Sequence, residues 1–217
     1  MLRGPMPRET LAFLLGLEMP LQFIQGNGDR AVLEEMAGTD EGDLPQPARE
    51  VVRWTARQLD PEHRRVLAGW PATLRMDIGG LGEVLFCHAT PRNDTEVFTR
   101  LTSERRLLPI FAQLDVPVVV CGHTHMQFDR TIGSTRVVNA GSVGMPYGEP
   151  VAHWLLLGPN NVELRRTAYD LQAAAERVRA TNYPQAEDFA ANNILQAPPE
   201  KEALEVFYQR RIDIEWH

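Results

Sequence analysis

Apolar runs and amphipathic segments alternate along the chain, and they predict a mixed α/β protein. Runs rich in β-branched and other apolar residues predict strands at 21–25, 72–78, 82–87, 117–121, 126–132, 135–139, 151–157 and 161–167. Apolar residues at helical spacing, with caps and prolines at their ends, predict helices. Four of them lie in the first half of the chain: one from Pro7, one over 29–38 with Asp29 as N-cap, one through 51–59 and one over 61–68. Two more follow, one over 94–114 with an interruption near Pro109 and one from Asp170 with breaks at Pro184 and Pro198. Glycine or asparagine pairs between neighbouring runs predict tight hairpins.

Length and composition restrict the class of protein. The 217 residues suit one domain with a helical appendage, for which we predict a main domain over 1–169 and a C-terminal helical extension over 170–217 packed on it. A formal net charge of −7 argues against a nucleic-acid-binding surface. No run approaches the ~18 apolar residues of a membrane span, and Cys87 and Cys121 suit buried thiols in a reducing compartment. We therefore expect a cytoplasmic protein.

Polar residues with ligand chemistry follow four of the predicted strands. Asn27 follows the strand at 21–25 and His88 the strand at 82–87, while His123 and His125 follow the strand at 117–121. A fourth run ends in Asn139, with Gly141 and Ser142 behind it. The carboxyl ends of strands are where open α/β sheets bind ligands. Imidazole and amide oxygen together suit divalent transition metals, so the pattern indicates a metal site; exposed loop histidines are the alternative.

Four motifs resemble those of the calcineurin-like metallophosphoesterases, in the bacterial phosphodiesterase-like branch. They are Gly26-Asn27-Gly28-Asp29, Cys87-His88-Ala89-Thr90, Gly122-His123-Thr124-His125 and Asn139-Ala140-Gly141-Ser142-Val143-Gly144. The resemblance implies two face-packed β-sheets flanked by helices. It also implies two divalent transition-metal ions (Mn, Fe or Zn), one bound by Asn27, His88 and His123 and the other by His125, or one ion alone in this chain. By the same resemblance Arg30 and Arg92 are candidates for phosphate contact, although arginine supplies nearly all positive charge here.

The sequence departs from the family pattern in two places. The Asp-x-His and Gly-Asp motifs that open the family pattern are absent, so the first two strands are missing from the expected fold. We expect these motifs to be encoded upstream of Met1. The second departure is Gly28, at a position where many members carry a histidine that protonates the leaving group. Such a general acid is worth about 10²–10⁴ in rate, so we expect a preference for good leaving groups.

Two functions follow from this reading. The first is metal-dependent hydrolysis of phosphate esters, as a phosphodiesterase or phosphatase acting on a small substrate. The second is a degenerate, non-catalytic relative that binds metal or acts as a scaffold. Neither involves nucleic acid or a membrane, and the sequence leaves a homo-oligomer open as an option.

Overall fold

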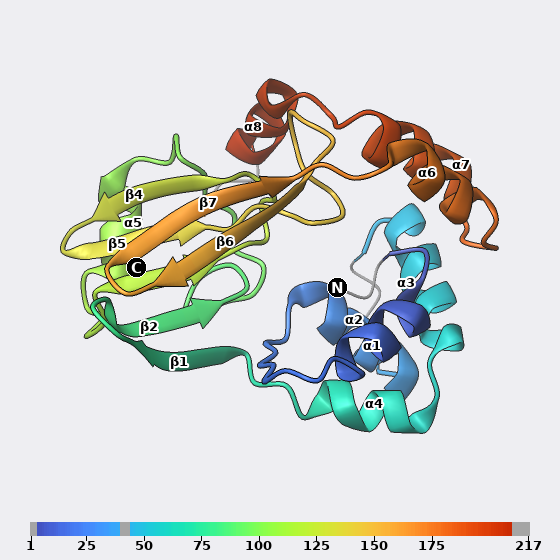
Figure 1. Ribbon diagram of the computed structural model, residues 1–217, viewed down its shortest axis with the longest axis horizontal. Helices are drawn as coiled ribbons and strands as arrows, with labels where there is room; N and C mark the ends of the chain where they lie inside the picture. Colours follow the sequence, from blue (N-terminus) through green and yellow to red (C-terminus); the bar gives the residue numbers. More distant parts are fainter. Residues whose placement is uncertain (1–3, 40–43, 210–217) are drawn as a thin grey trace.

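The computed structural model describes residues 4–39 and 44–209, and only the backbone of 208 and 209. Within these residues, seven strands form two sheets (Figure 1). The larger sheet has the order β1-β2-β3-β5-β4, from β1 (Thr73–Ile78), β2 (Gly82–Cys87), β3 (Val118–Cys121), β4 (Phe128–Ile132) and β5 (Thr135–Asn139). β6 (Ala152–Gly158) and β7 (Asn161–Thr167) form a separate antiparallel hairpin.

The hairpin covers one face of the larger sheet and a helix covers the other (Figure 1). Leu155 and Leu157 of β6 pack on Val84, Val118 and Val120. On the opposite face, α5 (Glu104–Phe111) buries apolar side chains against β2, β3, β4 and β5. The expected arrangement of two face-packed sheets flanked by helices is therefore confirmed. It arises because strands that are buried on both faces need an apolar layer on each side.

The other helices lie mainly to one side of the sheets. The N-terminal helices are α1 (Pro7–Leu15), α2 (Asn27–Ala37), α3 (Gln46–Gln58) and α4 (Pro61–Ala68). The C-terminal ones are α6 (Leu171–Arg179), α7 (Ala186–Phe189), the π-helical turn η1 (Ala190–Leu195) and α8 (Glu200–Gln209). α6, α7 and η1 share an apolar cluster with Val51 of α3, whereas α8 lies above the sheets (Figure 1). The domain division after residue 169 stays a prediction.

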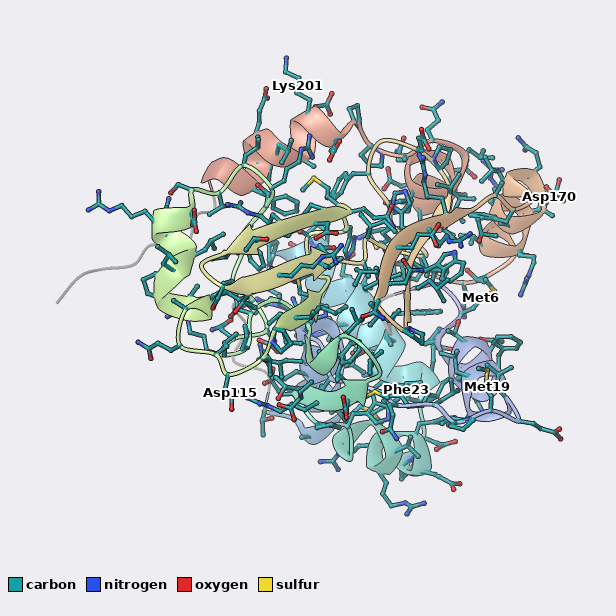
Figure 2. All side chains as sticks on the ribbon, turned by 60° about the vertical axis from the view of Figure 1, so that its left-hand side comes forward. Met6, Met19, Phe23, Asp115, Asp170 and Lys201 are labelled. Atoms are coloured by element: carbon teal, nitrogen blue, oxygen red, sulfur yellow. The ribbon has the colours of Figure 1, made fainter. Side chains whose placement is uncertain are left out.

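The predicted strand over 21–25 is wrong. Both edges of β2 are occupied, by β1 and by β3, so no position beside the His88 strand is open to it. The segment is extended but lies against the helices: Phe23 (labelled in Figure 2) stacks on Trp70 at 4.8 Å between ring centroids. The Gln25 amide N–H donates to the carbonyl of Pro71 at 2.8 Å. Asn27 therefore reaches the site from a helical body and not from a strand of the sheet.

Two predicted helix boundaries are also wrong. α2 begins at Asn27, and its N-cap is Gly26 instead of Asp29. Asp29 lies at the third helical position, where its carboxylate accepts the Gly26 N–H at 3.0 Å, as in a capping box. The helix expected over 94–114 is only α5, because Asn93 Oδ1 accepts the amides of Thr95 and Glu96 and forms a turn there. α5 continues through Pro109 and ends at Phe111.

Within the described residues, no helix has the length and apolar character needed to cross a membrane.

Cys87 and Cys121 are both buried and free. Burial raises the pKa of Cys87 to about 12. Because a metal-binding cysteine must be a thiolate, this thiol is a poor candidate for a ligand.

Candidate metal centre

The strand register brings three of the four motifs, those that follow β2, β3 and β5, to the same edge of the larger sheet. β2 and β3 are parallel with Phe86 opposite Val120, and β3 and β5 are parallel with Cys121 opposite Asn139. The segments that follow these strands therefore start side by side. The Gly122 N–H donates to the carbonyl of His88 at 2.9 Å, which joins the first two of these segments.

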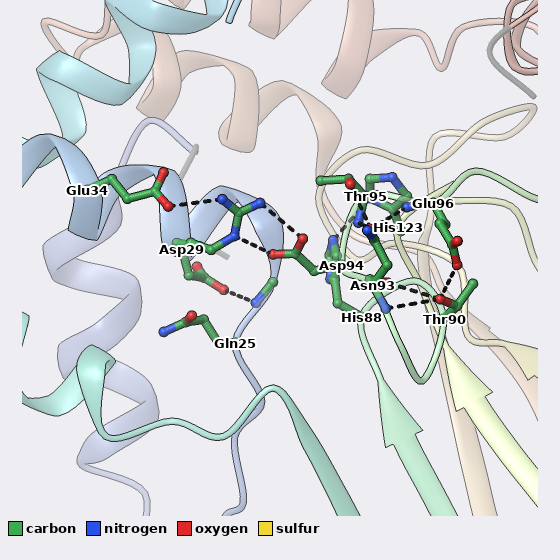
Figure 3. Close-up of polar contacts among 12 residues, drawn as sticks. Gln25, Asp29, Glu34, His88, Thr90, Asn93, Asp94, Thr95, Glu96 and His123 are labelled. Carbon is green, nitrogen blue, oxygen red and sulfur yellow. Dashed lines mark hydrogen bonds and ion pairs between the residues drawn. The ribbon is translucent and has the colours of Figure 1, made fainter. Parts of the chain in front are cut away.

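His88 and His123 meet at this edge (Figure 3). His123 Nδ1 lies 3.2 Å from His88 Nε2, and the two rings cross at 65° with centroids 5.0 Å apart. Burial, followed by the charge of His123, lowers the pKa of His88 to about 4. The His88 ring is therefore neutral at pH 7, which is the form that binds a metal ion.

The spacing of the two nitrogens fits one divalent ion. A metal–imidazole bond of about 2.0–2.1 Å places two adjacent nitrogen ligands about 2.8–3.0 Å apart in octahedral geometry and about 3.3–3.4 Å apart in tetrahedral geometry, a range of about 2.8–3.4 Å overall. The observed 3.2 Å separation lies within this range. This donor pair therefore fits the kind of metal that the sequence indicated.

The backbone at both histidines of the Gly-His-Thr-His motif is strained. His123 has φ of 63° and His125 has φ of 58°, and Asn160 is the other non-glycine residue with positive φ in the described chain. Such a conformation costs on the order of 1–3 kcal/mol for a non-glycine residue and persists only where neighbouring structure enforces it. The strain supports a functional role for this loop.

Asn139 is the residue that enforces this loop. Its Nδ2 donates to the carbonyl of Gly122 at 2.6 Å and to Thr124 Oγ1 at 3.1 Å. Its Oδ1 accepts the N–H of Gly141 at 2.9 Å. Buried at the end of β5, Asn139 therefore holds the histidine loop from the neighbouring strand. The sequence motif marked this residue but gave no indication of that role.

Gly26, the residue before Asn27, lies directly against His88. A Cβ atom placed on Gly26 would come within 2.6 Å of His88 Nδ1. The backbone just before Asn27 therefore packs against His88 around Nδ1, whereas Nε2 of the same ring faces His123. Only glycine allows this approach.

Replacing Gly26 by alanine should displace His88 or the start of α2. Overpacking of this kind costs about 1–3 kcal/mol in stability, and a displaced ligand should weaken Mn²⁺ binding at least ~10-fold. Thermal unfolding and Mn²⁺ titration measure the two effects. The matched control is Gly79→Ala, because an added Cβ there meets nothing within 4 Å. Equal metal affinity in both variants would contradict the packing argument.

His125 contacts the loop that follows β5. Its Nδ1 lies 2.9 Å from the carbonyl oxygen of Met145, which makes Nδ1 the protonated nitrogen and Nε2 the one that carries the lone pair. Metal-binding histidines are commonly oriented by such a carbonyl contact. Its ring centroid is 6.4 Å from that of Tyr147, so His125 faces the loop after β5.

Both arginines proposed for phosphate contact are engaged by carboxylates. Arg30 Nε and Nη2 donate to the two oxygens of Asp94 at 2.8 and 3.0 Å. Arg92 Nε and Nη2 both donate to Glu96 Oε1, at 2.8 and 2.5 Å. Asp94, which the sequence did not single out, binds Arg30 and lies beside His88 (Figure 3). Asp94 lies 64 residues after Arg30 in the sequence, so no helical or strand periodicity could have indicated that the two residues pair.

Carboxylates do not complete the centre within the part of the chain that is described. Among those residues, no three His, Cys, Asp or Glu side chains come together as a group that could hold a metal ion. The predicted ligand set for this ion contains one residue besides the two histidines, Asn27, which follows Gly26 at the start of α2.

Comparisons with known proteins identify the family and the fold of this chain. The family model for the calcineurin-like phosphoesterase superfamily domain matches residues 7–160. A hypothetical protein from Pyrococcus horikoshii OT3 has a similar fold, with a TM-score of 0.76 and 20% identity over 88% of this chain and 81% of that chain. A metallophosphoesterase from Sphaerobacter thermophilus is also similar, with a TM-score of 0.64 and 24% identity over 87% of this chain and 82% of that chain. No curated protein matches the sequence. On the strength of the family match and the motifs at the sheet edge, the chain belongs to the calcineurin-like phosphoesterase superfamily.

Proposed function

We propose that this protein hydrolyses phosphate esters with the help of divalent transition-metal ions held at the sheet edge. Asn27, His88 and His123 hold one ion and His125 holds a second. The observation that carries the proposal is the 3.2 Å approach of His88 Nε2 and His123 Nδ1, with Gly26 packed against the same ring. When bound, a divalent ion supplies Lewis-acid charge to the phosphoryl group and lowers the pKa of water.

The protein's own residues orient and limit this chemistry. The neutral His88 ring offers a nitrogen lone pair at pH 7, and the Met145 carbonyl orients His125. Gly28, on the first turn of α2, has no proton to give to a departing alkoxide. The substrate is therefore an ester whose leaving group departs without protonation, such as an aryl diester.

Apolar side chains beside His125 support this choice of substrate. Val143 is 65% exposed and Met145 is 37% exposed, in the same loop whose carbonyl contacts His125. Exposed apolar surface next to a polar site is typical of ligand contact. An aromatic leaving group would cover these side chains, whereas a sugar phosphate would not.

Hydrolysis of bis(p-nitrophenyl) phosphate and of a sugar monophosphate, each with Mn²⁺, tests the proposal. We expect the diester to react about 10²–10⁴-fold faster, since only the sugar alkoxide needs a general acid. A chelator should abolish turnover of both substrates. Turnover that persists in excess chelator is incompatible with the proposed chemistry.

A second candidate is a metal-binding protein without hydrolytic activity. The observation in its favour is that, among the described residues, no acidic side chain joins the histidines in a metal-binding group. In the same experiment this candidate predicts Mn²⁺ binding without turnover of either ester.

A further inference from the structure

The candidate metal centre lies between two parts of the molecule that have separate apolar cores. Asn27 begins α2, which packs on α3 and α4 through Val32, Val52 and Leu67. His88 and His123 follow strands whose core is formed with α5. No residue is shared by these two clusters. Apolar packing alone therefore does not fix Asn27 relative to the two histidines.

Arg30 spans this boundary. It lies three residues after Asn27 on α2. Its guanidinium forms a bidentate ion pair with Asp94, with hydrogen bonds of 2.8 Å from Nε and 3.0 Å from Nη2. Its third donor, Nη1, reaches Glu34 on the same helix at 3.0 Å. A planar guanidinium facing a carboxylate fixes direction as well as distance. The start of α2 is therefore held in a defined orientation toward the loop that carries Asp94.

The loop on the other side is fixed by its own hydrogen bonds. Thr90 and Asn93 exchange backbone hydrogen bonds at 3.0 and 3.3 Å. The Thr90 hydroxyl donates to Glu96 at 2.5 Å, and Arg92 holds the other oxygen of Glu96. This loop starts at His88 and presents Asp94 to Arg30 (Figure 3). Because this loop is stiff, holding Asp94 in place also helps to hold His88 in place.

The charge state of the pair is suited to this role. Burial acts to raise the pKa of Asp94, but the hydrogen bonds and charge of Arg30 outweigh it and lower the pKa below its usual value. The carboxylate is therefore ionised at neutral pH, and Arg30 already has an anionic partner. An incoming phosphate would have to displace Asp94 in order to bind this guanidinium.

We propose that the Arg30–Asp94 ion pair positions Asn27 against His88 and His123, and that Arg30 is a positioning residue instead of a phosphate-binding one. The proposal rests on the proposed function, because it assigns the pair to the same metal centre. Partly exposed ion pairs contribute little to global stability, about 0–1 kcal/mol. The effect of the pair should therefore appear in metal binding and not in unfolding.

Mn²⁺ titration and thermal unfolding of Arg30→Gln and Asp94→Asn test the proposal. We expect Mn²⁺ affinity to fall about 10–100-fold in each, as for residues that orient metal ligands, and no further in the double variant. The matched controls are Arg136→Gln and Asp129→Asn. Each removes a similar bidentate ion pair, in which Arg136 of β5 donates to the two carboxylate oxygens of Asp129 of β4 at 2.9 and 2.6 Å. The control variants should keep wild-type Mn²⁺ affinity.

Wild-type affinity in the Arg30 and Asp94 variants would overturn the proposal. A raised KM for the diester in Arg30→Gln with unchanged Mn²⁺ affinity would overturn it in favour of phosphate contact. Amide hydrogen exchange at the start of α2, measured without metal, distinguishes failure of the pair from failure of the proposed function. Faster exchange there in both variants, but not in the controls, supports the positioning role. Absence of Mn²⁺ binding by the wild-type chain would overturn the proposed function, and unchanged exchange would overturn the pair.

Discussion

His88→Ala and His123→Ala should each lower Mn²⁺ affinity by more than about 100-fold, beyond the 10–100-fold typical of residues that only orient ligands. The two nitrogens lie 3.2 Å apart, so each variant removes half of the donor pair that fits one ion. Imidazole must be neutral to bind, and the pKa of His88 is lowered to about 4, so affinity of the wild type should also fall as the pH is lowered toward 4. Isothermal titration of Mn²⁺ and of Zn²⁺ against the metal-free protein measures both effects.

His63→Ala is the matched control for this prediction. His63 lies in α4 and takes part in the cap with Asp60, with Nδ1 3.3 Å from the Asp60 N–H. It belongs to the helical body and is outside the candidate centre. Its replacement should leave Mn²⁺ affinity unchanged. Equal affinity among wild type, His88→Ala and His123→Ala would show that the ion binds elsewhere.

Phe111→Ala should destabilise the fold by about 3–5 kcal/mol, the usual cost of emptying a buried aromatic site. Phe111 is fully buried at the end of α5. Its ring packs edge-on against Phe98, with centroids 5.5 Å apart, within the core that supports β2 and β3. A domain is stable by only about 5–15 kcal/mol, so this one change removes a large part of the total.

Urea unfolding of Phe111→Ala, monitored by circular dichroism, measures this effect. Phe13→Ala makes the same chemical change at a side chain that is 67% exposed on α1. It should shift stability by less than about 0.5 kcal/mol. A similar cost in the two variants would contradict the assignment of α5 as the helix that covers the sheet.

Local patterns predicted most of the elements of this fold. All seven strands of the described residues and the hairpin turn between β1 and β2 were predicted from apolar runs and the turn residues beside them, and α4 follows from Asp60 before Pro61. Each of these signals lies within about ten residues, which is the range over which propensity and capping act. Of the two main failures, one was local in origin and the other was tertiary. The side chain of Asn93 forms a turn that competes with helix, and the apolar run at 21–25 has no strand beside it with which to pair.

The sequence by itself determined the family and indicated that His88 and the Gly-His-Thr-His motif follow neighbouring strands, while their role as metal donors stays a prediction. Gly122-His123-Thr124-His125 and His88 each follow a run of strand-forming residues, and parallel strands end together. Only the tertiary structure decided how these donors are held. Three contacts join residues from different elements: the hydrogen bonds of Asn139 to the histidine loop, the packing of Gly26 on His88, and the ion pair of Arg30 with Asp94. Side chains so far apart in sequence leave no periodic signal, because their spacing is set by packing of the helices and sheets and not by the local backbone.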